Sequence, residues 1–334
     1  MTGAAAQSDR IGLAIRSAPA PHREQHMRTD LDHLPAAKQR DLERVVQIIF
    51  EEFEDALSLA TQGWKKRGRI EKIILYGSYA RGNWVDEPHT AKGYRSDFDL
   101  LIIVNDKRLT DRAAYWSKLD ERLIRELTIT KTIHAPVNFI LHTLQEVNDG
   151  LAHGRYFFMD IKRDGIAVYQ ADDTELHEPK PKTPQQAFAM AKGYFDEWFP
   201  SAAGMLDTAR YVQSQGRLRE SAFQLHQATE RLYHCVLLVC TFYTPHVHNL
   251  AFLRSQAELI DRRLTRVWPW GSRRERAMFE KLKEAYVKAR YSSRYQISAE
   301  ELTWLGERVE ELGRVVLEIC NERIAALEQS ARAA

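Results

Sequence analysis

Two aspartates are the residues of this sequence best suited to chemistry. Asp97 and Asp99 flank Phe98, and an apolar run follows them directly. Residues i and i+2 of a strand share a face, so both carboxylates are expected to point the same way. Two such carboxylates repel and raise each other's pKa unless a cation lies between them. The pattern therefore predicts a metal site for Mg²⁺, with Mn²⁺ as the alternative.

A turn with polar side chains precedes the aspartates. Gly77 allows the backbone to approach an anion closely, and Ser78 offers a hydroxyl donor. Arg81 adds a fixed positive charge suited to phosphate oxygens, and Ser96 stands directly before the pair. A lone Asp-x-Asp is common at strand ends, so the order of all these features carries the prediction. Together they predict nucleotide phosphates at the turn and metal-assisted phosphoryl or nucleotidyl transfer.

The elements that must position these residues change in character along the chain. Apolar periodicity predicts helices over 34–63 and 111–127 and strands over 70–76, 98–104, 134–142 and 166–169. Beyond residue 179 only helical patterns remain, over 184–199, 201–215, 218–243, 249–262, 272–291 and 299–328. We therefore expect a flexible N-terminal extension (1–35), an α+β domain (36–178) and an all-α helical bundle (179–330). Residues 86–93 are expected to form a loop over the site.

Length and charge agree with two domains. The 334 residues exceed the roughly 250–300 at which single cores stop growing. The net charge of +2 excludes a strongly basic nucleic-acid binder, but it divides unevenly between the two domains. Residues 41–178 carry 19 basic and 24 acidic side chains, whereas residues 179–334 carry 23 and 18. Within 254–294 there are 12 basic and 5 acidic residues, a patch suited to a polyanion or to the acidic domain.

The sequence also indicates a compartment. Cys235, Cys240 and Cys320 lack the spacing of zinc ligands and are odd in number, which favours a reducing environment. The longest uncharged apolar run, 232–243, is well short of the roughly 20 residues of a membrane span. We expect a cytoplasmic protein that does not contact a membrane.

The segment GSYARG followed by SDFDLLIIV resembles the minimal nucleotidyltransferases of the DNA polymerase β-like superfamily. The resemblance extends over about residues 40–172. It implies a small mixed β-sheet flanked by helices, with Gly77 and Ser78 on the terminal phosphates of an NTP. It further implies Asp97 and Asp99 as catalytic Mg²⁺ ligands, and transfer of a nucleoside monophosphate, with ATP favoured as donor, to an acceptor hydroxyl.

One departure concerns the third carboxylate that this family often has on a later strand. The matching position here is Asn138, which cannot accept a proton and is a weaker metal ligand. Asp160 is an alternative carboxylate, although it lies in a helical stretch where a solvated acid is the simpler interpretation.

The helical half resembles a HEPN domain over about residues 187–324. The residues that carry the resemblance are FQLHQATE (223–230), PHVHNL (245–250) and AYVKARYSSRY (285–295). Many HEPN domains are ribonucleases with an Arg followed, after four to six residues, by a His, but Arg290 has no such His.

The remaining candidates in this region are Arg290, Tyr291, Arg294 and Tyr295. They are candidates for nucleotide binding, and the two tyrosines are also candidate acceptors of a nucleotide. A packed cluster at one end of the bundle is an equally good interpretation. His226 and His248 fit buried or capping roles better than catalytic ones.

Three functions follow. The first is a nucleotidyltransferase whose HEPN domain binds nucleotide or presents the acceptor, which is an RNA, a protein tyrosine or a small molecule. The second is a nucleotide-binding regulatory module of the toxin–antitoxin type, and the third is a HEPN ribonuclease. The HEPN resemblance also implies a homodimer formed through helices.

Overall fold

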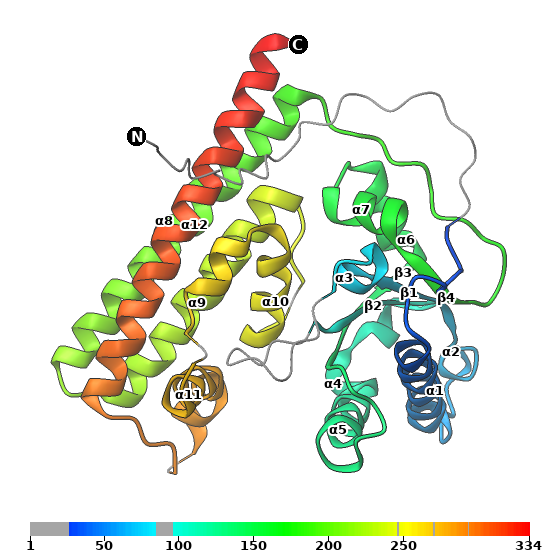
Figure 1. The fold of residues 1–334 in the computed structure, drawn as a ribbon, viewed down its shortest axis with the longest axis horizontal. Helices are drawn as coiled ribbons and strands as arrows, with labels where there is room; N and C mark the ends of the chain where they lie inside the picture. The colour runs from blue at the N-terminus through cyan, green and yellow to red at the C-terminus, as the bar shows by residue number, and fades with distance from the viewer. Residues whose placement is uncertain (1–26, 85–95, 246, 270, 293) are drawn as a thin grey trace, which may run out of the picture.

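The computed structural model describes residues 27–84, 96–245, 247–269, 271–292 and 294–334 (Figure 1). The first 26 residues of the expected extension and the expected loop at 86–93 lie outside the described residues. From Met27 onward the chain contacts the first domain, because Arg28 forms a bridge with Ile166 and Leu34 is buried.

A four-stranded mixed sheet forms the centre of the first domain. Its strands are β1 (Ile70–Tyr76), β2 (Phe98–Val104), β3 (Val137–Thr143) and β4 (Ile166–Gln170), in the order β3-β2-β1-β4. β2 and β3 run parallel, and the other two pairs are antiparallel. β2 is buried along its whole length, as its unbroken apolar run predicts. The expected small mixed sheet is therefore confirmed.

Helices cover both faces of this sheet. On one face, α1 (Ala36–Leu57) and α5 (Ser117–Arg125) pack against alternate residues such as Leu100 and Ile102. On the other face, α6 (Leu144–Ala152) and α7 (Tyr156–Asp164) pack against Leu101 and Ile103. Because side chains alternate along a strand, Asp97, Asp99, Asn138 and Tyr76 belong to this second face. Shorter elements complete the domain: α2 (Gly63–Lys66), α3 (Gly77–Arg81), η1 (Lys107–Thr110), α4 (Arg112–Tyr115) and η2 (Glu126–Thr130).

The helix expected over 111–127 is interrupted. Trp116 separates α4 from α5, and its fully buried indole donates to the Leu109 carbonyl at 2.7 Å. Burying this large ring against the sheet fixes the chain at a conformation that a continuous helix would not allow. Local periodicity does not reveal such a tertiary constraint.

The second domain is helical, as expected. It consists of α8 (Pro184–Ser214), α9 (Leu218–Thr241), α10 (Leu250–Ile260), η3 (Arg262–Arg266), α11 (Arg273–Tyr291) and α12 (Ala299–Ala333). Capping boxes at Thr183 and Ser298 start α8 and α12. The expected break near residue 200 is wrong, because α8 continues through Pro200. The long helices α8, α9 and α12 share one apolar core, which offsets the backbone hydrogen bond that proline removes.

The two domains meet at α10. In Figure 1 this helix lies between the bundle and the sheet, on the side of α3 and β2. Tyr243 and Phe252 of the helical half belong to the same apolar cluster as Ile74, Leu101 and Ile140 of the sheet. Residues 171–183, which connect the domains, form no helix or strand. Among the helices in the described ranges, none has both the length and the apolar character needed to cross a membrane.

Candidate active site

The turn between β1 and α3 brings backbone close to a carboxylate. Gly77 adopts a φ of +76°, a conformation that glycine accepts readily. A Cβ atom added to Gly77 would lie 2.5 Å from Asp99 Oδ2, so no other residue fits here without displacing that carboxylate. Ser78 is buried beside this turn, and Arg81 at the end of α3 is exposed. Ser96 is buried directly before Asp97.

The register of the sheet assembles the polar residues. Asp99 pairs with Tyr76 of β1 on one side and with Asn138 of β3 on the other. Asn138 Nδ2 donates to Asp97 Oδ2 at 2.8 Å. The structure therefore places Asn138 beside the two aspartates, at the position where the family resemblance implies a third carboxylate.

Burial strongly affects both carboxyl groups. It raises the pKa of Asp97 to about 6, opposed by the Asn138 hydrogen bond and reinforced by Glu258. Burial, and then the neighbouring Asp97, raise the pKa of Asp99 well above its ordinary value, while the charge of Arg81 acts in the opposite direction. Both groups are therefore costly to ionise in the protein alone, and a bound cation would relieve that cost.

The donor set fits a hydrated magnesium ion. Within the described ranges, no group of three or more His, Cys, Asp or Glu side chains is arranged to hold a metal. Mg²⁺ does not need such a group, because it is usually bound by one or two carboxylates together with substrate phosphates and water. Asp97 and Asp99 beside the Gly77 turn supply that partial set.

Asp160 takes part in an ion pair of its own. It is about half exposed on α7 and forms an ion pair with Arg163 at 2.7 Å. It is near enough to Arg81 for their charges to interact. Its position fits a surface ion pair better than a third metal ligand.

The helical domain contributes residues that the sequence did not indicate. Gln256 of α10 donates from Nε2 to Asp99 Oδ1 at 2.9 Å, and Tyr76 donates its hydroxyl to Gln256 Oε1 at 3.4 Å. Ser255 Oγ accepts a hydrogen bond from Asn138 at 3.3 Å. The sequence gives one local indication of these contacts. Gln256 is polar, although it lies next to Ala257 on the apolar face of its helix.

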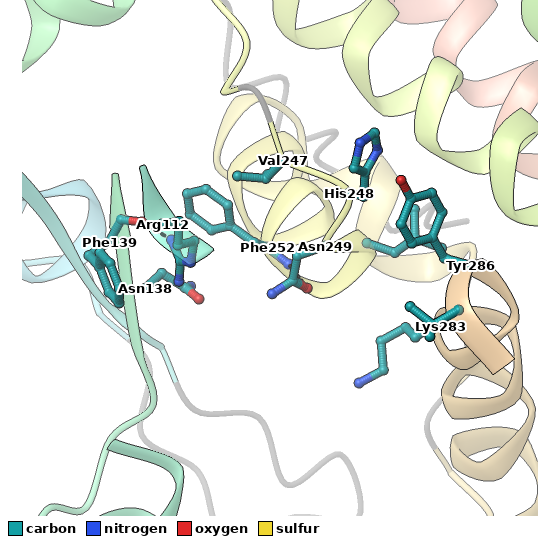
Figure 2. A pocket seen from close by; sticks show the side chains of 11 residues that line it. Arg112, Asn138, Phe139, Val247, His248, Asn249, Phe252, Lys283 and Tyr286 are labelled. Atoms are coloured by element: carbon teal, nitrogen blue, oxygen red, sulfur yellow. Dashed lines mark hydrogen bonds between the residues drawn. The ribbon is translucent and has the colours of Figure 1, made fainter. Parts of the chain in front are cut away.

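A cavity of about 410 Å³ opens beside Asn138 between the two domains. Figure 2 shows Arg112, Asn138 and Phe139 on one side of it and Lys283 and Tyr286 on the other. His248 and Asn249, which lead into α10, and Phe252 in its first turn lie between them. As far as the described residues show, the lining contains cationic, amide, aromatic and aliphatic groups and no carboxylate. It suits an anionic or aromatic molecule.

The HEPN-like residues form a second cluster around Tyr286. The Glu230 carboxylate accepts from His248 Nδ1 at 3.0 Å, and the imidazoles of His226 and His234 lie 3.8 Å away. Burial opposes ionisation of Glu230, but its interactions with the neighbouring His234 and His248 outweigh that effect and lower its pKa. Burial lowers the pKa of His226 to about 4, so its ring is neutral at pH 7.

Arg290 and His248 both contact the ring of Tyr286. The Arg290 guanidinium lies 4.5 Å from the centroid of Tyr286, and the His248 ring stacks on Tyr286 at 4.5 Å. The two candidate tyrosines differ sharply, since Tyr291 is 76% exposed and Tyr295 is only 6% exposed. The Tyr295 hydroxyl donates to the Lys281 carbonyl, whereas Arg294 is exposed in the loop after α11. Arg290 and Tyr291 are therefore brought together, and Tyr295 is a packing residue.

Many cations of the basic segment are already paired within the chain. Arg263 binds both Asp261 and Glu322, and Lys281 binds Glu301. Lys283 and Lys288 pair with glutamates one turn away. These ion pairs reduce the charge that the segment offers to a polyanion.

Comparison with known proteins agrees with both halves of this description. Residues 61–148 match the family model described as polymerase beta, nucleotidyltransferase, and residues 195–320 match the HEPN domain model. A curated relative from Methanocaldococcus jannaschii, named "Putative protein adenylyltransferase MJ0604", is 54% identical over 39 residues. That match covers 12% of this chain and 31% of the relative, so the chain spans under a third of the relative's length. The chain thus contains a region similar to the polymerase beta nucleotidyltransferases, followed by a region similar to HEPN domains.

Proposed function

We propose that this protein is an Mg²⁺-dependent nucleotidyltransferase that moves a nucleoside monophosphate from ATP to an acceptor hydroxyl. The observation that carries the proposal is the Asp97/Asp99 pair, in which Asp97 is partly buried and the buried Asp99 faces the Gly77 turn. Asp97 and Asp99 hold the metal, which when bound neutralises phosphate charge and polarises the phosphate under attack. Gly77, Ser78, Arg81 and Ser96 bind the phosphates.

In this reaction the acceptor oxygen forms a bond to the α-phosphorus, and the bond from that phosphorus to pyrophosphate breaks. The acceptor hydroxyl loses its proton. Asn138 cannot take that proton, because an amide has no basic site at neutral pH. The proton therefore passes to solvent, and slow turnover is expected compared with an enzyme that has a general base, which contributes typically 10²–10⁴-fold.

A protein hydroxyl is the acceptor that we favour. The relative's name supports adenylyl transfer to protein, and the cavity beside Asn138 gives a donor-rich place for the acceptor side chain. Tyr291 is the candidate within this chain, because it is exposed beside Arg290.

Mass spectrometry of the purified protein after incubation with Mg²⁺ and each NTP tests the proposal. We expect a mass increase of one nucleoside monophosphate with ATP, or labelling of an added protein, and its loss in Asp97→Ala/Asp99→Ala. Tyr291→Phe should abolish self-labelling, while the matched Tyr295→Phe should retain it. Equal labelling with and without the two aspartates would refute a transferase.

A nucleotide-binding regulatory module of the toxin–antitoxin type is the second candidate. Asn138 at the third carboxylate position and the contact of α10 with Asp99 favour it. Calorimetry would then show ATP binding without release of pyrophosphate, whereas sustained pyrophosphate release would exclude this candidate.

A further inference from the structure

Gln256 reaches from the helical domain into the carboxylate pair of the other domain. Its hydrogen bond to Asp99 joins residues that are 157 positions apart in the chain. Gln256 is 5% exposed and Asp99 is 3% exposed, so water does not compete for this bond. The contact belongs to the interior of the site.

Tyr76 determines which way the Gln256 amide faces. The Tyr76 hydroxyl donates to Oε1, so the nitrogen of the amide is the end that faces Asp99. Tyr76 lies opposite Asp99 in the register of β1 and β2. The oxygen and the nitrogen of the Gln256 amide therefore both bind residues of the transferase domain.

The amide uses one particular oxygen of Asp99. Gln256 binds Oδ1, whereas Oδ2 is turned toward Gly77 and the turn where phosphates are expected. Asn138 makes an equivalent contact, amide to carboxylate, with Asp97 Oδ2. Asn138 also acts on Asp99, whose pKa is lowered by hydrogen bonds from both Gln256 and Asn138. The two carboxylates thus have amide partners from β3 and from α10. Partners of this kind orient metal ligands and tune the affinity of the site.

We propose that Gln256 is a positioning residue of the nucleotidyltransferase site, and that this site is complete only when the HEPN domain is docked. The inference rests on the proposed function. Gln256 fixes the rotamer of Asp99 so that Oδ2 faces the metal and phosphates. The HEPN domain is then a structural part of the active site in addition to any role in presenting the acceptor.

The same contact has an opposite interpretation that an experiment separates. If Gln256 blocked the carboxylates, its removal would free them, and both metal affinity and turnover would rise. If Gln256 positions Asp99, its removal lets the carboxylate rotate, and both quantities fall.

The test compares Gln256→Met with the wild type and with Gln224→Met. Methionine preserves the length and volume of the side chain but has no amide. Gln224 of α9 is partly buried in the same domain, and it serves as the matched control. Binding of Mn²⁺, followed by electron paramagnetic resonance, gives a readout that does not need catalysis. Labelling with ATP gives turnover and KM.

We expect Gln256→Met to weaken Mn²⁺ binding and to lower kcat by about 10–100-fold each, with Gln224→Met unchanged. Tyr76→Phe removes only the hydrogen bond that the Tyr76 hydroxyl donates to the Gln256 amide. It should therefore cause a smaller loss of Mn²⁺ binding and of kcat. It also serves as the second variant if Gln256→Met does not fold.

The outcomes separate this inference from the proposed function. If the wild type binds Mn²⁺ more tightly than Gln256→Met but does not label, the positioning role stands and the transferase activity fails. If the wild type labels and Gln256→Met and Tyr76→Phe match it or exceed it in both readouts, the positioning role is overturned. A wild type that binds no Mn²⁺ overturns both.

Discussion

The Asp97 carboxyl combines burial with a place in the proposed metal site, and this makes its protonation a measurable quantity. Burial raises its pKa to about 6. An acid with a higher pKa in the folded than in the unfolded protein binds its proton more tightly when folded. Its contribution to stability is fully present below the unfolded pKa of about 3.9 and is lost as pH rises through about 6.

Asp97→Asn should therefore gain stability relative to the wild type as pH rises. We expect the difference in free energy of unfolding, variant minus wild type, to grow by about 2–3 kcal/mol between pH 4 and pH 7 without metal. Denaturant unfolding at several pH values measures it. Asp106→Asn is the control, since hydrogen bonds from Arg108 lower the pKa of Asp106 to about 2. Its difference from the wild type should stay nearly constant between pH 4 and pH 7 and change only below pH 4. A difference for Asp97→Asn that does not change with pH would contradict the burial of this charge.

When no metal is bound, hydrogen bonds from Asn138 favour the ionised form of the two carboxyl groups. Asn138 donates to Asp97 and pairs with Asp99 in the sheet. Asn138→Asp would replace this donor by a third negative charge, so we expect the metal-free protein to lose about 1–3 kcal/mol of stability. Added Mg²⁺ should then raise the melting temperature more than in the wild type, because three carboxylates bind the cation better than two.

Thermal melting with and without Mg²⁺ checks this expectation. Asn321→Asp adds the same charge on an exposed face of α12 and should leave the effect of Mg²⁺ unchanged. An equal Mg²⁺ effect in wild type and Asn138→Asp would show that Asn138 does not face the metal.

At the scale of elements, the turn from β1 into α3 depends on glycine for two separate reasons. Gly77 and Gly82 have nearly the same positive φ, +76° and +75°. A Cβ at Gly77 meets Asp99 Oδ2 at 2.5 Å, whereas the nearest atom at Gly82 is His33 Cδ2 at 3.6 Å. Substitutions at the two glycines therefore distinguish two effects. Both would introduce backbone strain, but only a substitution at Gly77 would also clash with Asp99.

Gly82→Ala should cost about 1–2 kcal/mol of stability and keep Mn²⁺ binding and ATP labelling. Gly77→Ala carries the same backbone strain and also displaces Asp99, so we expect it to lose both activities. Unfolding curves and labelling of the two variants make the comparison. If both variants lose labelling equally, strain in α3 rather than the position of Asp99 controls the site.

The elements also show what can be predicted from sequence. The apolar run over 98–104 and the helical pattern over 299–328 are local signals, and β2 and α12 confirm the elements they predict. The break expected at Pro200 is wrong, because packing along α8 overrides a local rule. Asp97 and Asp99 were visible because their spacing of two residues fixes a shared face. Gln256 was not, because its partner is 157 residues away and no local pattern encodes that contact.

For the whole molecule, the important feature is an apolar cluster that both domains share. Phe252 is 3% exposed against residues of the sheet, and Tyr243 stacks on Phe157 at 4.3 Å. The Tyr243 hydroxyl also hydrogen-bonds His142 Nε2 at 2.8 Å. Separating the domains would expose this cluster to water, so neither domain should unfold without affecting the other.

Calorimetry of the full chain should therefore show one unfolding transition. Phe252→Ala removes a side chain from the shared cluster, at a cost of about 3–5 kcal/mol, and should split the transition into two. Phe279→Ala removes a ring of similar burial that belongs to the core of the bundle, and it should lower a single transition without splitting it. Two transitions in the wild type would mean that the domains are independent. One transition that splits only in Phe252→Ala would tie the stability of the sheet that carries the carboxylate pair to α10.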